Sequence, residues 1–174
     1  MPDPIFELIQ SRRSIRAFHP DEISDETIAK ILTAGIWAPT GGNVQPWHFY
    51  LVRSQLGREQ LADAALNQNF ISQAPVVIVV CADIDRARRG YKQRGVNLYC
   101  LQDTAAAIQN MLLAVHALKL GACWVGAFSE EKVTALLALP PVHRPVALVP
   151  IGRPAEKPKP PDRRSLFQVF TEID

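Results

Sequence analysis

The stretch Ala74-Pro75-Val76-Val77-Ile78-Val79-Val80-Cys81-Ala82 is the longest uninterrupted apolar run in the chain. Residues 75–81 are dominated by β-branched side chains and show no alternation of polar and apolar positions, which predicts a strand buried on both faces. Such a strand belongs at the centre of a sheet. The run is about half as long as a bilayer crossing requires, so neither it nor the acid-containing N-terminus predicts a membrane span or signal peptide.

Helices and further strands are predicted on both sides of this central strand. Ser24 is a suitable N-cap for one of the helices, because Asp25 and Glu26 follow it in the first turn and Pro39 lies beyond the last apolar residues. Hydrophobic periodicity predicts helices over 3–11, from 24 to 39, over 97–119 and from 129 to about 139, and strands over 47–52 and 146–151, with a short strand or extended segment over 121–128.

The 97–119 helix is apolar on more than one side. One face repeats at steps of three or four residues, and the opposite side is apolar as well. In a chain of this size the second side can be covered by another subunit, so this helix is a candidate dimer interface. The first face comprises Leu98, Leu101, Ala105, Ile108, Leu112 and Val115, and the other side Met111, Leu113 and Ala114.

Length and composition indicate one globular domain. The chain has 174 residues, of which 48% are hydrophobic and 21% charged. The formal charge of +2 is too small to predict a nucleic-acid surface. Three cysteines without a Cys-x-x-Cys pair argue against a disulfide framework or a zinc site and favour a reducing compartment. We therefore expect a cytoplasmic protein with no nucleic-acid or membrane partner.

The C-terminal part is rich in proline. Residues 140–161 contain 8 of the 14 prolines, and the part after Gly152 reads as an extended linker. Apolar residues follow it, namely Leu166, Phe167, Val169 and Phe170. Because these side chains need to be buried, residues 153–174 of the single domain 1–174 are predicted to be a tail that packs on a partner subunit.

The sequence lacks the usual signatures of side-chain catalysis. It contains no Gly-x-Ser-x-Gly, no His-Glu-x-x-His and no Gly-x-Gly-x-x-Gly after a strand, so hydrolase, zinc-protease and Rossmann interpretations have no support. The four histidines, His19, His48, His116 and His143, are isolated from other plausible ligands in the sequence, and no metal site is predicted.

Arginine is concentrated near the two ends of the chain. Of the 19 cationic residues 13 are arginine, and residues 11–16, Ser-Arg-Arg-Ser-Ile-Arg, combine three of them with two serines at a helix end. Guanidinium groups, hydroxyls and spare amides are what a phosphate needs. The alternative is a solvated basic helix end. Arg163 and Arg164, beyond the proline linker, could fold back to the same anion.

Two further segments offer backbone to a ligand. Residues 39–47 hold two glycines between prolines, next to Trp47, and predict a tight loop with accessible amides or simply a structural turn. Gly126 in an apolar segment indicates a close backbone approach, either to a ligand or to another strand. A phosphorylated flavin fits both segments and the arginines, and it would carry the chemistry that no side chain supplies.

These residues resemble the FMN-dependent nitroreductase family over about residues 6–170. The resemblance implies an α+β three-layer sandwich, with a mixed, mainly antiparallel sheet between helices, in an intertwined homodimer with two FMN sites. The motifs that carry it are residues 12–18 (RRSIRAF), 38–47 (APTGGNVQPW), 74–79 (APVVIV), 102–107 (QDTAAA), 121–128 (GACWVGAF) and 151–154 (IGRP).

The resemblance also implies roles for individual residues. The phosphate and ribityl chain would be held by Arg12, Arg13, Ser14 and Arg16, with contacts from Asn67 or Gln68 and from one of Arg163 and Arg164. The other subunit would contribute Pro39, Thr40, Gly41 and Asn43, and the amides of Val125 and Gly126 would lie near the flavin N5. Thr-Gly-Gly stands where many members have Ser-Ser, so amides would replace a hydroxyl, and Asp162 stands where lysine is common.

The activity implied is ping-pong reduction of nitroaromatics, quinones or related acceptors by NAD(P)H through hydride transfer at N5. Little room is expected between Ile71 and Asn97 for inserted helices, which would leave the acceptor site open. The alternatives are a dehalogenase or flavin-cleaving branch, an FMN carrier or sensor without turnover and, last, a basic nucleic-acid module. The pocket walls would be Phe70, Tyr91, Arg94, Trp124 and Phe128.

Overall fold

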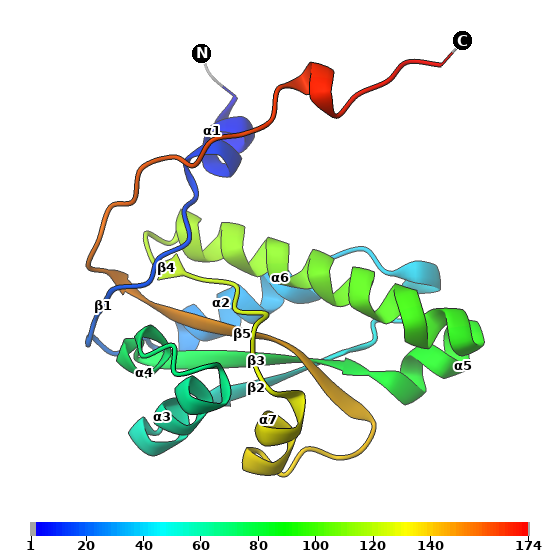
Figure 1. Cartoon of the computed structure of the whole chain (residues 1–174), viewed down its shortest axis with the longest axis horizontal. Helices are drawn as coiled ribbons and strands as arrows, with labels where there is room; N and C mark the ends of the chain where they lie inside the picture. The colour runs from blue at the N-terminus through cyan, green and yellow to red at the C-terminus, as the bar shows by residue number, and fades with distance from the viewer. Residues whose placement is uncertain (1–2, 174) are drawn as a thin grey trace.

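The computed structural model describes residues 3–173, which form an α+β domain (Figure 1). The helices are α1 (Pro4–Ser11), α2 (Asp25–Ile36), α3 (Gln55–Ala64), α4 (Phe70–Gln73), α5 (Ile84–Arg94), α6 (Cys100–Ala117) and α7 (Glu130–Leu136). The strands are β1 (Phe18–His19), β2 (Trp47–Val52), β3 (Val76–Asp83), β4 (Gly121–Ala122) and β5 (His143–Pro154). Short helical turns at Gly41–Asn43, Gly95–Tyr99 and Leu166–Gln168 complete the order.

The apolar run at 74–82 forms β3 in the middle of the sheet, as predicted. The strand order is β1-β5-β3-β2, with β4 also paired to β5, and every named pair is antiparallel. The parallel element is an isolated bridge between Ser14 and Ala122. Residues 76–82 are completely buried, since β2 and β5 flank the strand and helices cover both faces.

Two core layers lie on the two faces of the sheet. Val76, Ile78 and Val80 pack with residues of α2 and α6, whereas Val77 and Val79 pack with residues of α3 and α7. Figure 1 shows α6 and α2 on one side of the sheet and α3 and α7 on the other. The predicted three-layer sandwich with a mixed, mainly antiparallel sheet is therefore confirmed.

Helix α6 contributes Ile108, Met111, Leu112 and Val115 to one core layer. Ser24 caps α2 by accepting from the Thr27 amide, as predicted, and α2 packs on α6 so closely that a Cβ at Gly35 would lie 2.9 Å from Met111 Cγ. Met111 is fully buried here, together with Ile108. Its predicted place on the opposite side of the helix is wrong, because it shares the buried stripe. Leu113 and Ala114 do remain only half-buried.

Sequence periodicity did not predict α3, α4 and α5, whose apolar stripes are short. The interval between Ile71 and Asn97 contains β3 and the 11-residue helix α5, and the expectation of little room there for further inserted helices stays a prediction. Helix α5 is kinked at Tyr91 and Lys92, whose backbone angles are not helical, and the chain then passes through the Gly95–Tyr99 turn into α6.

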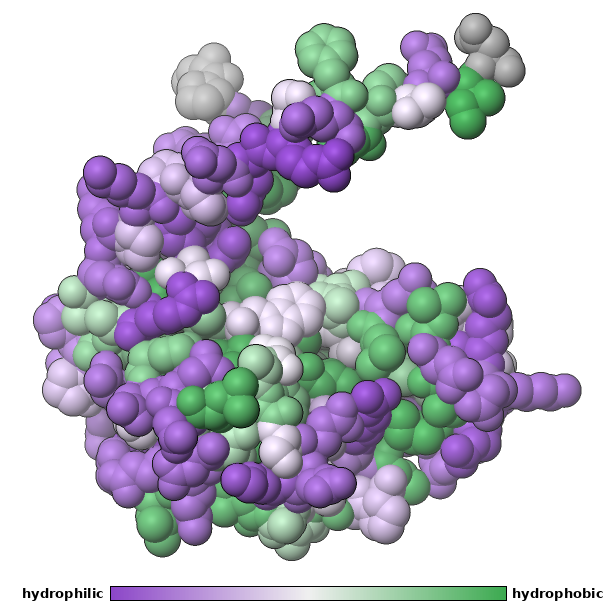
Figure 2. All heavy atoms as spheres, viewed as in Figure 1, coloured by the Kyte–Doolittle hydropathy of each residue, from purple (hydrophilic) through white to green (hydrophobic). Residues whose placement is uncertain are grey.

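The N-terminal helix and the C-terminal segment form an arm beside the domain. After β5 the chain passes α1 and runs away from the sheet, and Figure 2 shows a hollow between this arm and the body. The apolar side chains of the arm are exposed, with Phe167 97% and Leu166 71% accessible. Packing of this tail on a partner therefore remains a prediction.

Candidate functional site

The arginine cluster begins at the C-terminus of α1, whose last residue is Ser11. A helix C-terminus presents free carbonyl groups, and Arg13 Nη1 donates to two of them, Gln10 O at 2.6 Å and Arg12 O at 2.8 Å. The helix end itself therefore offers carbonyl groups rather than amides, although within residues 3–173 the Arg13 and Ser14 amides just beyond it have no acceptor. An anion bound here would be held mainly by side chains.

The backbone after the helix is fixed to the edge of the sheet. Ser14 forms the parallel bridge with Ala122, and the Ile15 amide donates to Ala122 O at 3.0 Å. Ile15 is buried and lies so close to the sheet that a Cβ at Gly121 would be 2.8 Å from its Cγ1. These contacts hold Ser14 at a defined position between arginines.

The cluster lines a cavity of about 280 Å³. Arg163 folds back from the C-terminal segment to join it, so residues about 150 positions apart in sequence face one space. Burial lowers the pKa of Arg12, and the neighbouring charges of Arg13 and Arg163 lower it further. The lining comprises Arg12, Arg13, Ser14, Arg16, Pro158, Lys159, Pro161 and Arg163.

The charges of this cavity have no acidic partners. Within residues 3–173, neither the four arginines of the cavity nor Lys159 forms an ion pair. Glu156 approaches the cluster, but its carboxylate accepts the backbone amide of Arg16. No sequence pattern could have shown Glu156 or Lys159, because both reach the site through the path of the proline-rich segment. The cavity can bind an anion such as a phosphate.

Arg163 and Arg164 are separated by the structure. Arg163 lines the cavity, whereas Arg164 Nη2 donates to Gln168 O at 2.5 Å within the C-terminal segment. Of the two arginines left open by the sequence, only Arg163 reaches the cluster in this chain.

A second part of the site adjoins the cluster through Arg16 and Phe70. The Arg16 guanidinium carbon lies 5.9 Å from the centre of the Phe70 ring. Gln68, just before α4, donates from Nε2 to Ala65 O at 2.9 Å and to Ala127 O at 3.2 Å, which ties its turn to the 124–128 segment. Asn67, in the same turn, is exposed and has a positive φ of 59°.

The two amides expected near a flavin differ. The Val125 amide donates to Leu148 O at 2.9 Å, so within this chain it is engaged with the sheet, and its place near a flavin stays a prediction. Within the described chain, the Gly126 amide has no acceptor, and a Cβ at this exposed glycine would meet nothing within 4 Å. Trp124 beside it is 39% exposed, whereas Phe128 packs against the core beneath the sheet.

The loop of residues 39–45 lies at the other end of α6. The Gly41 amide donates to Asp103 Oδ1 at 3.2 Å, in the first turn of the helix. Ser11, at the arginine cluster, instead bonds to His116 Nε2 at 2.8 Å in the last turn. At 1.5 Å per residue these two positions on α6 are about 20 Å apart. One chain therefore does not bring Pro39, Thr40, Gly41 and Asn43 to its own cluster.

Tyr91 and Arg94 lie with this loop rather than with the cluster. A Cβ at Gly42 would come 2.5 Å from the Tyr91 hydroxyl, and Tyr91 packs edge-on against Tyr99 with ring centres 5.0 Å apart. Arg94 Nε donates to the Tyr99 hydroxyl at 2.9 Å. These two predicted pocket walls are thus separated within the chain from Phe70, Trp124 and Phe128.

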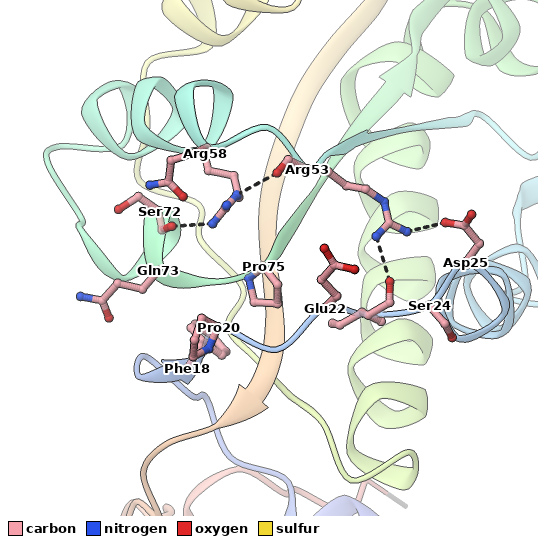
Figure 3. Close-up of a pocket in the computed structure, with 12 residues that line it drawn as sticks. Phe18, Pro20, Glu22, Ser24, Asp25, Arg53, Arg58, Ser72, Gln73 and Pro75 are labelled. Atoms are coloured by element: carbon pink, nitrogen blue, oxygen red, sulfur yellow. Dashed lines mark hydrogen bonds and ion pairs between the residues drawn. The ribbon is translucent and has the colours of Figure 1, made fainter.

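Another cavity, of about 880 Å³ and thus larger than that of the arginine cluster, lies near the start of β3, beside α3 and α4 (Figure 3). It contains two arginines whose donors are already engaged. Arg58 donates to Arg53 O at 3.2 Å and Ser72 O at 2.6 Å, and also to Ala74 O. Arg53 donates to Ile23 O and forms an ion pair with Asp25 at 2.6 Å. The arginines of this cavity therefore have fewer free donors for an anion than those of the terminal cluster.

Two histidines are brought together by the sheet. His48 stacks on His143 with ring centres 4.3 Å apart, and His143 Nδ1 bonds to Tyr50 at 2.6 Å, so the predicted isolation of these two is wrong. Even so, residues 3–173 contain no group of three or more His, Cys, Asp or Glu side chains placed to hold a metal ion.

Comparison with known proteins identifies the family. The model of the nitroreductase family matches residues 9–73 and 63–153. A protein of Archaeoglobus fulgidus, provisionally named NADH dehydrogenase/NAD(P)H nitroreductase, is 36% identical over 155 residues, which cover 87% of this chain and 86% of that protein. The chain belongs to the nitroreductase family.

Solved structures agree with this assignment. A protein from Desulfovibrio desulfuricans, provisionally named a nitroreductase and crystallised in complex with FMN, is 35% identical, with a TM-score of 0.87 over 100% of this chain and 99% of that one. The NADPH:FMN oxidoreductase from Vibrio harveyi, complexed with NAD+, is 27% identical, with a TM-score of 0.90 over 99% of this chain and 78% of that one. No helix in the described chain is long and apolar enough to span a membrane.

Proposed function

We propose that this protein is an FMN-dependent oxidoreductase that uses NAD(P)H to reduce nitroaromatics, quinones or related acceptors. The observation that carries the proposal is the cavity in which Arg12, Arg16 and Arg163 meet beside Ser14 and form no ion pair with an acid among residues 3–173. The FMN-bound and NAD+-bound relatives support the choice of cofactor and donor.

The residues present fit a phosphorylated flavin on two counts. The uncompensated guanidinium groups and the Ser14 hydroxyl suit a phosphate, because charge-assisted hydrogen bonds from arginine are short, strong and often bidentate. The unpaired Gly126 amide borders open space, into which a flat ring system can pass without meeting a side chain. The engaged Val125 amide is not available as a donor for such a ring.

When bound, FMN would supply the redox chemistry, taking a hydride from NAD(P)H and returning it to an acceptor in ping-pong order. The chain's own residues would bind and orient the cofactor. Arg12, Ser14, Arg16 and Arg163 would hold the phosphate and ribityl chain, and Asn67 or Gln68 would border the ring. Of the Val125 and Gly126 amides, only the Gly126 N–H is free to contact the flavin ring. The neighbouring Trp124, which is exposed, would border the acceptor space.

A complete site requires two copies of the chain. In one chain the 39–45 loop and the arginine cluster lie at opposite ends of α6. Two α6 helices packed antiparallel about a two-fold axis would bring the loop of one subunit beside the cluster of the other. The half-buried Leu101, Leu113 and Ala114 and the exposed arm provide apolar surface for this contact.

Tyr91 and Arg94 would then accompany the loop of their own chain to the partner's cluster, because Tyr91 packs against that loop and Arg94 donates to the neighbouring Tyr99. The tail, from residue 153 on, would cover part of the partner, which gives its exposed Phe167 and Phe170 a place of burial.

The absorbance spectrum of the purified protein tests the cofactor. We expect a flavin band after purification or after reconstitution with FMN, and its loss in the Arg12→Ala/Arg16→Ala double variant. A protein that stays colourless and cannot be reconstituted contradicts the proposal.

A turnover assay distinguishes the proposed oxidoreductase from the remaining alternative, an FMN carrier or sensor. We expect rapid oxidation of NADH or NADPH when a quinone or nitroaromatic is added. A reduced flavin that persists beside excess acceptor would instead support the carrier. The dehalogenase and flavin-cleaving branches have no specific observation in their favour here.

A further inference from the structure

Asp103 is a buried acid to which nothing above gives a role. Its side chain is 7% exposed, in a helix whose neighbouring residues are mostly apolar. Within residues 3–173 it has no cationic partner, and the hydrogen bond that it does make goes to the Gly41 amide at 3.2 Å. Burying an acid without a counter-ion costs free energy, so a compensating role is expected.

The loop that receives this contact satisfies most of its other groups internally. The Asn43 and Val44 amides donate to Thr40 O and Gly41 O, both at 3.1 Å. The Gln45 amide donates to Thr40 Oγ1 at 3.1 Å, and Gln45 Nε2 donates to Asn43 Oδ1 at 3.1 Å. The described chain shows no acceptor for the Gly42 amide or the Asn43 side-chain NH2, so these remain as donors for a ligand.

The backbone of the loop enters the left-handed region at several residues and is held there by neighbouring helices. Gly42, Asn43 and Gln45 all have positive φ, of 53°, 55° and 54°. Helix α5 supports the loop from one side, through Tyr91 against Gly42 and through Arg86 Nε, which donates to Val44 O at 2.5 Å. Asp103 supports the loop from α6. Among residues 3–173, its carboxylate is the side-chain group outside the loop that accepts a hydrogen bond from a loop amide.

We infer that Asp103 is a positioning residue for cofactor binding: its carboxylate fixes Gly41 and so directs the Gly42 amide and the Asn43 side chain outward to the flavin of the partner subunit. This inference rests on the proposed function. It also corrects the expectation that the Gly41 amide itself replaces a missing hydroxyl contact, because that amide points inward to α6.

A simpler role for Asp103 would be to stabilise the N-terminal turn of α6 through its charge. The helical turn at Gly95–Tyr99 argues against this, since it leads directly into α6, the Cys100 amide already donates to Gly95 O and Leu98 O, and the helical backbone therefore does not begin freely at Cys100. The two roles predict different behaviour for an asparagine, which keeps an acceptor oxygen but loses the charge.

The test compares three variants by FMN titration, followed by flavin fluorescence or absorbance. Asp103→Ala removes the acceptor, and we expect FMN binding to weaken by about 10- to 100-fold, because a hydrogen bond to a charged group is lost. Asp103→Asn keeps an acceptor, and we expect its affinity within about threefold of the wild type. Equal loss in both variants would overturn the hydrogen-bonding role.

Asn110→Ala is the matched control. Asn110 lies on the same helix and ties α6 to α2 through Nδ2, which donates to Ala34 O at 3.1 Å, but it does not contact the loop. We expect this variant to lose thermal stability and to keep its FMN affinity. If it weakens FMN binding as much as Asp103→Ala does, the effect is general destabilisation and the inference fails.

Hydrogen exchange supplies a readout that does not depend on the cofactor. In the apoprotein, the Gly41 amide should exchange faster in Asp103→Ala than in the wild type or in Asn110→Ala. Unchanged Gly41 exchange would contradict the inference even if FMN binding fell. A wild-type protein that binds no FMN at all would instead defeat the proposed function, and the exchange result would still decide whether Asp103 fixes the loop.

Discussion

Two cavities of this molecule are lined by arginines, and they differ in what the guanidinium groups already do. In the cavity near α3 and α4, Arg58 donates to backbone carbonyls and Arg53 binds Ile23 O and Asp25 (Figure 3). In the terminal cluster, Arg12, Arg16 and Arg163 face a smaller space, about 280 Å³, without an ion pair in the described chain. Volume alone would favour the cavity whose arginines are already engaged.

The difference shows how structural and ligand-binding arginines can be told apart. An arginine whose donors meet carbonyls or a carboxylate stabilises the fold, and removing it leaves buried acceptors unpaired. Arginines that lie close together without acids repel each other, and that cost is recovered when an anion binds. Burial is the main cause of the lowered pKa of Arg12, and the positive charges of Arg13 and Arg163 lower it further.

The largest expected effect is on FMN affinity. Arg12→Ala combined with Arg16→Ala should weaken FMN binding by at least about 100-fold, because two charge-assisted contacts to the phosphate are lost. Arg53→Ala is the control from the other cavity, and its dissociation constant should stay within about twofold of the wild type. Flavin titration measures both, and equal effects would remove the distinction between the two cavities.

The free energy of unfolding should depend more on the arginines near α3 and α4 than on those of the terminal cluster. Arg58→Ala should lower the free energy of unfolding by about 2 kcal/mol, since several carbonyl groups lose their donor. Arg12→Ala should leave that free energy unchanged or raise it slightly in the apoprotein, because like charges are separated. Urea denaturation at one fixed protein concentration provides the comparison. A larger loss for Arg12 than for Arg58 would show that the terminal cluster has a structural role.

Within the terminal cluster, the two neighbouring tail arginines should differ. Arg163→Ala should weaken FMN binding by about tenfold, as expected for one charged hydrogen bond. Arg164→Ala should change it by less than about twofold, because Arg164 already donates to Gln168 O. If Arg164 proves the more important, the C-terminal segment adopts another register in the assembled protein.

The smallest effect concerns pH. Burial lowers the pKa of His116, and the charges of Lys119, Arg12 and Arg13 lower it further. The unfolded chain then takes up a proton near pH 6.5 that the folded chain binds only at lower pH, so stability of the apoprotein should fall as the pH drops below about 6.5. His143, whose pKa is also lowered by burial, acts in the same direction.

Denaturation curves between pH 5 and pH 8 can separate the two histidines. His116→Gln should make the fall shallower and leave the His143 contribution, and bound FMN phosphate should reduce the His116 contribution by offsetting the nearby positive charge. A fall of unchanged steepness in His116→Gln would show that His116 does not titrate with folding.

The sequence was sufficient for the central strand, the Ser24 cap and the arginine cluster, because each depends on local chemistry. It could not show that the Val125 amide is taken by Leu148, or that Gly41 donates to Asp103, since both depend on tertiary contacts. A single acid in the apolar helix at 97–119 was the available signal for Asp103. The sequence also could not separate Arg163 from Arg164, whose directions depend on the path of the proline-rich segment.

The central claim is that each site is built from the arginine cluster of one subunit and the 39–45 loop of its partner. Mixing two inactive variants tests this directly. One is Arg12→Ala/Arg16→Ala, and the other is Gly42→Val, whose added side chain would collide with Tyr91 at a residue of positive φ. Co-refolded in equal amounts, they should form mixed dimers in which one of the two sites is intact.

Random pairing then predicts that about one quarter of all sites recover FMN binding with wild-type affinity. Each variant refolded alone should show none. Recovery to about that level, measured by flavin titration of the mixture, is the result that we expect. A mixture that binds no more FMN than the two separate variants would contradict the shared site.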